Sequence, residues 1–250
     1  MPPSADLALL SLIQWLSPAF PTGGYAYSHG LEQAVVDATL TNAASLKDWL
    51  TDVLTHGTGR QDAILLACAL RPDADLDALT DLALALSSSA ERHHETLAQG
   101  TALALTVSAL PISAQPISAQ PVSALTVSAF TVSALPISAL TVPALTGGPL
   151  KARPFPVALG EAAAPLCLST PQVLSLYLHA FASNLVQAMV RFVPLGQTEG
   201  QATLASLHPL ISHLADTLAT ATEDDLATST FGAELAAMRH ETLQPRIFKT

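Results

Sequence analysis

The chain has 250 residues, half of them hydrophobic, which is enough to bury the core of one large domain. Its formal net charge is −10 and its ten Lys and Arg residues form no cluster, which argues against nucleic-acid binding because phosphates require clustered cations. Cys68 and Cys167 lie far apart and no basic stretch precedes the first apolar run, so we expect a reduced, cytoplasmic protein without a signal peptide.

Residues 1–103 predict a series of helices. Ser4 or Asp6 can cap the first helix, which ends before Pro18 because the residue preceding a proline disfavours helical backbone. The apolar side of this helix is expected to carry Leu7, Leu10, Ile13 and Leu16. Further helices are expected at about 27–39, 46–54, 64–70, 77–87 and 90–106.

An uncharged repeat follows between residues 104 and 143. Its unit is Ala-x-Pro/Thr-Ile/Val-Ser, and a period of five fits neither a helix nor a strand. Proline at the third position fixes φ and removes an amide donor, so we expect extended, poorly ordered chain, with a small β-solenoid as the alternative. The repeated prolines also argue against a membrane span. Residues 104–150 are therefore interpreted as an insertion into the domain.

Residues 151–238 predict the second helical half of the same domain. Thr170-Pro171 opens a long apolar helix that ends before Pro194. Another helix is expected at about 200–221, and a short terminal segment begins near Glu223. No alternating strand pattern stands out, so the sequence predicts an all-α protein, a single-domain helical bundle interrupted by the pentapeptide repeat, with a tail at 239–250.

The eight histidines are the natural place to search for metal or acid–base chemistry. His93 and His94 are adjacent and point to different faces of a helix, and His208 and His213, five residues apart, do not share a face. The sequence contains no phosphate-binding loop, no nucleophile elbow and no HExxH pattern. We therefore expect no catalytic residues, no cofactor and no built-in metal site.

Three stretches contain more than a plain helical bundle requires. The first is SPAFPTGGYAYSHGLE, residues 17–32, which combines prolines, glycines and aromatic residues. The second is PLGQTEGQ, residues 194–201, directly after the long apolar helix. The third is MRHETLQPRIFKT, residues 238–250, which places charged and aromatic residues at the end of the chain. Together these stretches predict contact surfaces.

The same stretches resemble the urease accessory protein UreF family, and they occur in the family's order. LSPAFPTGGYAYSHGLE is similar to the family signature, SNLVQAMVRFVPLGQTEGQ to its long helix and following loop, and MRHETLQPRIFKT to its C-terminal tail. The resemblance covers nearly the whole chain outside residues 104–150. One departure is Pro245, which removes a backbone donor that the family tail more often keeps.

The resemblance implies an all-α, usually dimeric scaffold and GTPase regulator that is not itself an enzyme. Its partners would be a UreD-like protein (also called UreH), a UreG-like GTPase and urease apoprotein, in a complex that inserts nickel into urease with GTP hydrolysis. The partner-binding residues that the resemblance implies are Gly23, Gly24, Tyr25, Tyr27, Ser28, Glu32, Gln197, Arg239, His240, Glu241, Arg246 and Phe248.

Several expectations for the structure follow. Residues 17–32 would form a rigid elbow in which Tyr25 and Tyr27 either contact a partner or fill the core, and Gly24 would sit where a side chain cannot. The tail should be mobile alone and dock through Phe248 and Arg246. The alternatives to the scaffold are a nickel-binding metallochaperone that uses surface histidines and a small helical hydrolase.

Overall fold

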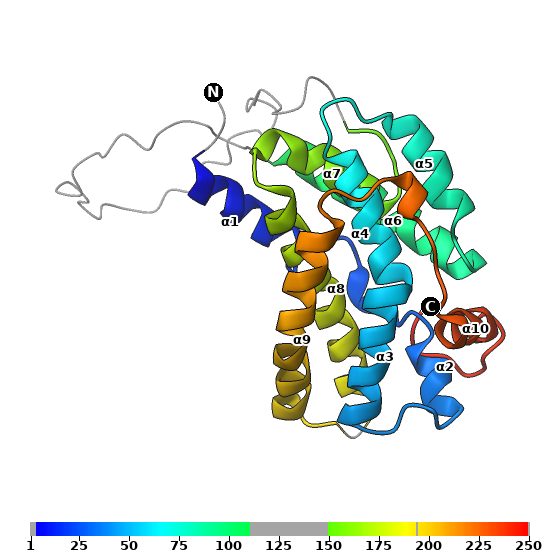
Figure 1. Ribbon diagram of the computed structural model, residues 1–250. Helices are drawn as coiled ribbons and strands as arrows, with labels where there is room; N and C mark the ends of the chain where they lie inside the picture. The colour runs from blue at the N-terminus through cyan, green and yellow to red at the C-terminus, as the bar shows by residue number, and fades with distance from the viewer. Residues whose placement is uncertain (1–3, 111–149, 194, 250) are drawn as a thin grey trace, which may run out of the picture.

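The computed structural model describes residues 4–110, 150–193 and 195–249, and every regular element in these ranges is helical (Figure 1). The first half contains α1 (Ala5–Trp15), α2 (Leu31–Val36), α3 (Ala43–His56), α4 (Thr58–Ala69), α5 (Leu76–Ala85) and α6 (Ala90–Ala109). The second half contains α7 (Phe155–Ala163), α8 (Thr170–Phe192), α9 (Gln197–Leu218) and α10 (Phe231–His240), with 3₁₀ turns η1 (Gly24–Ala26), η3 (Ala164–Leu166) and η4 (Glu223–Asp225). The predicted all-α class is confirmed.

Helix α4 forms the centre of the core. Every residue from Gln61 to Ala69 is buried, as expected for a segment that is apolar on nearly all sides. The helix contacts α3, α5, α7, α8 and α9. Helix α7 lies so close that a Cβ atom at Gly160 would be 2.4 Å from Cβ of Ala69. Small residues at this crossing therefore set the distance between the two helices.

Helices α8 and α9 pack against each other and against α3 and α4. Helix α8 begins at Thr170, after the capping residue Ser169 and with Pro171 in its first turn, which confirms the predicted start. By length and composition alone α8 could cross a membrane, but half of its most apolar window is buried in the fold. The core helix of a soluble protein passes the same test, so this helix is weak evidence for a membrane span.

Helix α1 is rotated relative to the sequence prediction. Its buried residues are Ala8, Leu12 and Trp15, whereas the predicted apolar side, with Leu7, Leu10 and Ile13, is about half exposed. Trp15, the largest side chain of the helix, is almost fully buried and fixes this rotation. The predicted start is confirmed, because the Ser4 side chain accepts a hydrogen bond from the amide of Leu7.

The first residues of the repeat are helical. Helix α6 continues to Ala109, and Ala104 and Val107 are buried, so the first repeat unit belongs to the folded body. The predicted boundary at 104 is therefore wrong by about one and a half turns of helix. The expectation of extended chain in the remaining repeat lies outside the described residues. The amide of Leu150 donates to Oγ of Ser108 at 3.4 Å. The end of the range 4–110 and the start of the range 150–193 therefore lie next to each other.

Two helices were not predicted, α7 and α10. Helix α7 follows Arg153, whose buried guanidinium bonds to the Leu76 carbonyl and to Asp77 on α5 and Glu161 on α7. Helix α10 was interpreted as part of a short terminal segment, but it lies against α2 and α6 (Figure 1). Both helices are held by contacts with distant parts of the sequence, which a local pattern does not reveal.

Candidate interaction site

The elbow, residues 17–32, leads from the end of α1 into the first turn of α2. The helix predicted to start near Tyr27 starts at Leu31, because His29 and Gly30 have φ of 52° and 76° and cannot continue a helix. A Cβ atom at Gly30 would lie 2.6 Å from the amide nitrogen of Ala237, so the elbow presses directly on α10. At Gly24 a Cβ atom would meet only side chains, the nearest being Asn184 at 3.3 Å. The close approach predicted for Gly24 therefore occurs at Gly30.

The two tyrosines of the elbow have different environments. Tyr25 is 60% exposed, whereas Tyr27 is buried. Burial, followed by the charge of Glu95, raises the pKa of Tyr27 above its ordinary value, so this side chain stays neutral. The two alternatives weighed from the sequence thus each apply to one residue: Tyr27 fills the core, and Tyr25 is available to a partner.

Beneath the elbow lies a buried network of charged and polar side chains, called here the interior network: His29, Asp62, Arg92, Glu95 and Tyr177. Nε2 of His29 is 3.0 Å from Oε1 of Glu95, and Nη1 of Arg92 is 3.3 Å from Oε2 of the same residue. Arg92 also pairs with Asp62, which accepts a hydrogen bond of 2.8 Å from the Tyr177 hydroxyl. The network connects the elbow to α4, α6 and α8.

Charge pairing controls ionisation in the interior network. Burial raises the pKa of Glu95, but His29 and Arg92 outweigh it and leave the pKa below its ordinary value. Burial, followed by the Asp62 carboxylate, raises the pKa of Tyr177 well above its ordinary value. The network borders a cavity of about 50 Å³ that is also lined by Gly24 and Tyr25. Within the interior network, each carboxylate has a neighbouring His29 or Arg92 side chain, so its charge is balanced inside the protein.

A second set of charges, called here the tail clamp, holds the C-terminal tail: Glu32, Glu91, His240 and Arg246. His240 has no exposed surface, and its Nδ1 lies 2.8 Å from Oε2 of Glu91 while its Nε2 lies 3.0 Å from Oε2 of Glu32. Both ring nitrogens can donate only in the doubly protonated imidazolium form. Arg246 pairs with the other oxygen of Glu91. The clamp thus joins α2, α6 and the end of α10.

The tail itself packs on the body of its own chain. The amides of Ile247 and Phe248 donate to the two oxygens of Glu32 at 2.8 and 2.9 Å. The Phe248 ring is buried against Phe192, with ring centroids 6.3 Å apart, and the amide of Lys249 donates to the Ala26 carbonyl at 2.7 Å. The tail predicted to be mobile alone therefore lies on its own chain, because the body supplies both charged and aromatic partners for Arg246 and Phe248.

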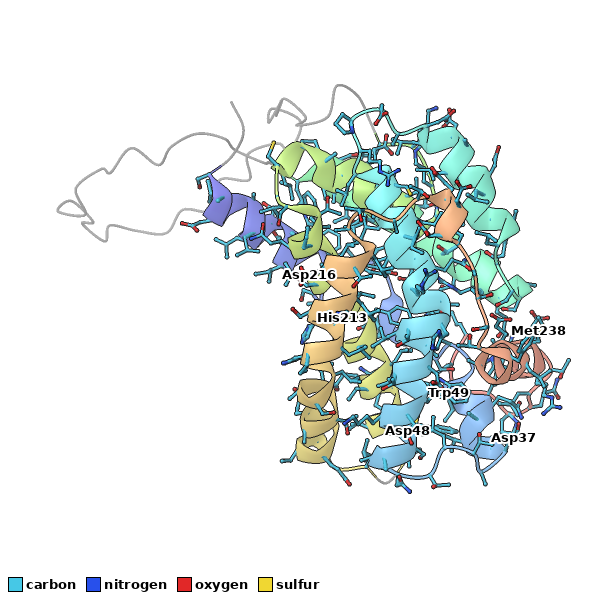
Figure 2. The ribbon with its side chains drawn as sticks, viewed as in Figure 1. Asp37, Asp48, Trp49, His213, Asp216 and Met238 are labelled. Carbon is cyan, nitrogen blue, oxygen red and sulfur yellow. The ribbon has the colours of Figure 1, made fainter. Side chains whose placement is uncertain are left out.

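Five exposed apolar side chains lie on α2, α10 and the tail, the segments that the tail clamp joins, and are called here the tail face. Phe231, Leu235 and Met238 follow one side of α10, and Phe231 is 79% exposed. Val36 and Ile247 are the other exposed members. Figure 2 shows Met238 and Asp37 on one side of the molecule, opposite His213 and Asp216 on α9. This grouping of exposed apolar side chains is typical of an interaction site.

A groove of about 380 Å³ lies between α3 and the start of α10. Trp49, His56 and Phe231 contribute to its walls. The indole nitrogen of Trp49 is buried and has no hydrogen-bond partner within the described residues. An N–H group in this state is costly unless a ligand or a partner supplies an acceptor.

The predicted partner-binding residues divide by exposure. Tyr27, Ser28, Glu32, His240 and Phe248 are buried. Tyr25, Gln197, Arg239, Glu241 and Arg246 are exposed, and Gly23 and Gly24 are intermediate. The structure brings the elbow and the tail residues together through the tail clamp. Gln197 begins α9, and no described hydrogen bond or ion pair joins it to either region.

The histidines considered from the sequence lie apart from this site. His93 and His94 are exposed on α6, and His208 and His213 are exposed on α9. His208 pairs instead with His179 on α8, a partner that the sequence did not suggest. Burial, followed by the neighbouring His208, lowers the pKa of His179. No group of three or more His, Cys, Asp or Glu side chains within the described ranges could hold a metal ion.

Sequence reasoning also missed the interior network. The available signal was Asp62, the only carboxylate of α4, directly before a run of apolar residues from Ala63 to Ala69 that is buried throughout. A buried carboxylate requires a compensating charge, which predicts a nearby cation without identifying it. Arg92, which provides that charge, belongs to a different helix, 30 residues further along the chain.

Comparison with known proteins identifies relatives over almost the whole chain. The UreF family model matches residues 40–208. The chain is 54% identical to the urease accessory protein UreF of Cereibacter sphaeroides (strain ATCC 17029 / ATH 2.4.9), over 97% of this chain and 99% of that protein. It is 44% identical to the UreF of Paracoccus denitrificans (strain Pd 1222), over 98% and 97% of the two chains, and 42% identical to that of Jannaschia sp. (strain CCS1), over 97% and 94%. The chain therefore belongs to the UreF family of urease accessory proteins, which serve urease maturation and are not themselves enzymes.

Proposed function

We propose that this protein is a scaffold in the complex that matures urease, and that the tail face docks a UreD/UreH-like accessory protein. The tail face carries the proposal, because it has five exposed apolar side chains and because the buried clamp residue Glu32 holds the Ile247 backbone in place. Family membership supports association with other urease accessory proteins. A soluble protein gains from covering such a surface with a partner.

The groove beside the tail face indicates the chemistry of the partner segment. Phe231 offers a largely exposed ring, and Trp49 forms part of the wall beside it. A segment that inserts an apolar side chain beside the Phe231 ring would fill the groove and cover this ring. Aromatic residues beside a groove are the usual anchors of protein interfaces.

Buried and exposed members of the predicted site have different roles in this proposal. Glu32, His240 and Phe248 hold the tail in place and act on the partner indirectly. Tyr25 and Arg239 are exposed and contact the partner directly, with Arg239 already oriented by Asp37 at 3.6 Å. The clamp residues thus determine the shape of the surface, and the exposed residues determine what it binds.

The wider assembly follows from the same family role. A UreG-like GTPase and urease apoprotein would join the complex, nickel would be its cargo, and GTP hydrolysis would be coupled to nickel insertion. We also expect a cytoplasmic homodimer. These elements rest on the family resemblance, and none of them is assigned to particular residues.

The experiment is coexpression with the UreD-like protein of the same organism, followed by size-exclusion chromatography. Leu235→Lys places a charge in the tail face and should abolish the complex. Leu10→Lys is the matched control, because Leu10 is an exposed leucine of α1, 61% exposed against 47% for Leu235. Both variants should keep the helix content of the parent protein. A full-strength complex with Leu235→Lys would show that the partner docks elsewhere.

A further inference from the structure

Two histidine rings lie together on the surface formed by α8 and α9. His179 is half-buried on α8 and His208 is exposed on α9. Their ring centroids are 5.4 Å apart, and the ring planes are inclined by 46°. The two helices pack closely against each other, so the packing fixes the backbone positions of both residues. Neither residue contributes to the interior network, the tail clamp or the tail face.

The distance between the rings matches the requirement of a shared metal ion. Two imidazoles bound to one tetrahedral ion through nitrogens at about 2.1 Å have centroids roughly 5 Å apart. The observed separation is within a few tenths of an ångström of that value, so chelation requires no change in the distance between the rings. Placement on two packed helices also lowers the cost of orienting the ligands.

We propose that His179 and His208 form a surface site for one divalent transition-metal ion. Imidazole nitrogen suits Ni²⁺, Cu²⁺ and Zn²⁺, and disfavours Mg²⁺ and Ca²⁺, which require oxygen ligands. No third protein ligand completes the group within the described residues, so water fills the remaining positions. A site with open positions exchanges its ion, which suits transient metal holding and not a structural role. The site is independent of partner docking at the tail face.

The test is isothermal titration of the untagged, full-length protein with NiCl₂ and separately with ZnCl₂, at about pH 7.5, where histidine is mostly neutral. One ion should bind per chain. His179→Ala and His208→Ala should each weaken binding by about 100-fold, because the second ligand of a chelate acts at high effective concentration. His213→Ala, which removes another exposed histidine from α9, is the matched control and should bind as the parent does.

A spectroscopic measurement separates ligation from an effect on folding. Electron paramagnetic resonance of the Cu²⁺-loaded protein should show two nitrogen ligands in the parent and in His213→Ala, and fewer in His208→Ala, whose exposed side chain can be removed without disturbing the core. Metal binding by the double variant His179→Ala/His208→Ala that is as strong as binding by the parent would overturn the proposal. So would the absence of binding to the parent at about 1 mM metal. Neither result bears on the scaffold role, which the partner complex tests separately.

Discussion

The interior network and the tail clamp both start from the first turns of α6, but they occupy different environments. Arg92 and Glu95 point into the core and meet groups from the elbow, α4 and α8. Glu91, their neighbour in sequence, meets His240 and the half-exposed Arg246 of the tail. Helix α6 thus contacts the core through Arg92 and Glu95 and the C-terminal tail through Glu91.

The comparison shows that burial of charge can serve two purposes. In the interior network, every charged partner belongs to a helix or elbow packed in the core, so a group that loses its partner stays away from water. In the tail clamp, Arg246 is half exposed and lies near the end of the chain, so we expect it to return to solvent without opening the core. Loss of a partner should therefore be a global defect in the first case and a local one in the second.

The largest effect is expected from Asp62→Ala. The substitution leaves the Arg92 guanidinium buried with reduced compensation and removes the acceptor of the Tyr177 hydroxyl. The free energy of unfolding should fall by about 3–5 kcal/mol, measured by urea denaturation. Asp48→Ala, at an exposed carboxylate on α3, should change it by less than about 0.5 kcal/mol. Similar values for the two variants would remove the energetic basis of the comparison.

Gly30→Ala tests the place where the elbow meets α10. The new Cβ atom would approach the Ala237 amide at 2.6 Å, and alanine is strained at a φ of 76°. We expect a loss of at least about 2 kcal/mol in the free energy of unfolding. Gly24→Ala, where only movable side chains lie nearby, should cost less than about 1 kcal/mol. Equal losses at both glycines would place the critical contact elsewhere in the elbow.

His240→Gln tests whether the tail is attached locally. Glutamine lacks the two ring nitrogens through which His240 contacts both carboxylates of the clamp. Hydrogen exchange at the Ile247 and Phe248 amides should become about 10-fold faster or more, while the free energy of global unfolding falls by only about 1–2 kcal/mol. Truncation after Thr242 should likewise leave the helical body folded and weaken the UreD-like complex. Cooperative unfolding of the whole protein in either variant would contradict a separable clamp.

The smallest effect is expected from removing the repeat at the boundaries that the structure gives. Leu110 and Leu150 flank the gap, and Ser108 already contacts the Leu150 amide. Replacement of residues 111–149 by a short Gly/Ser linker should leave thermal stability and both ionic clusters nearly unchanged, because loop-closure entropy depends weakly on length. Deletion from 104 should be worse, because it removes the buried Ala104 and Val107. Equal stability of the two deletion proteins would show that the last turns of α6 are dispensable.

Local periodicity was sufficient for much of the fold. The cap at Ser4, the amphipathic α3 and the start of α8 at Thr170 were predicted because each depends on residues within one or two turns. The rotation of α1 was mispredicted because Leu7 and Leu10 are apolar but half exposed, a state that hydrophobicity alone does not distinguish from burial.

The contacts among the named residues of the site could not be predicted from the sequence. The sequence identified Glu32 and His240, but their contact joins positions 208 residues apart and has no local signal. Pro245 raised doubt about docking of the tail, yet the donors that dock it belong to Ile247 and Phe248, beyond the proline. Long-range charge pairing is therefore the information that residue patterns lacked.

The Glu32 carboxylate binds the peptide N–H groups of the tail and not the side chains of the tail. Its two oxygens receive consecutive main-chain N–H groups, a form of recognition that depends little on which residue occupies position 247. The Ile247 side chain remains exposed and free to vary during evolution. A lineage could thus alter the chemistry that it presents to a partner at this position without loosening the tail, provided that neither peptide nitrogen becomes that of a proline.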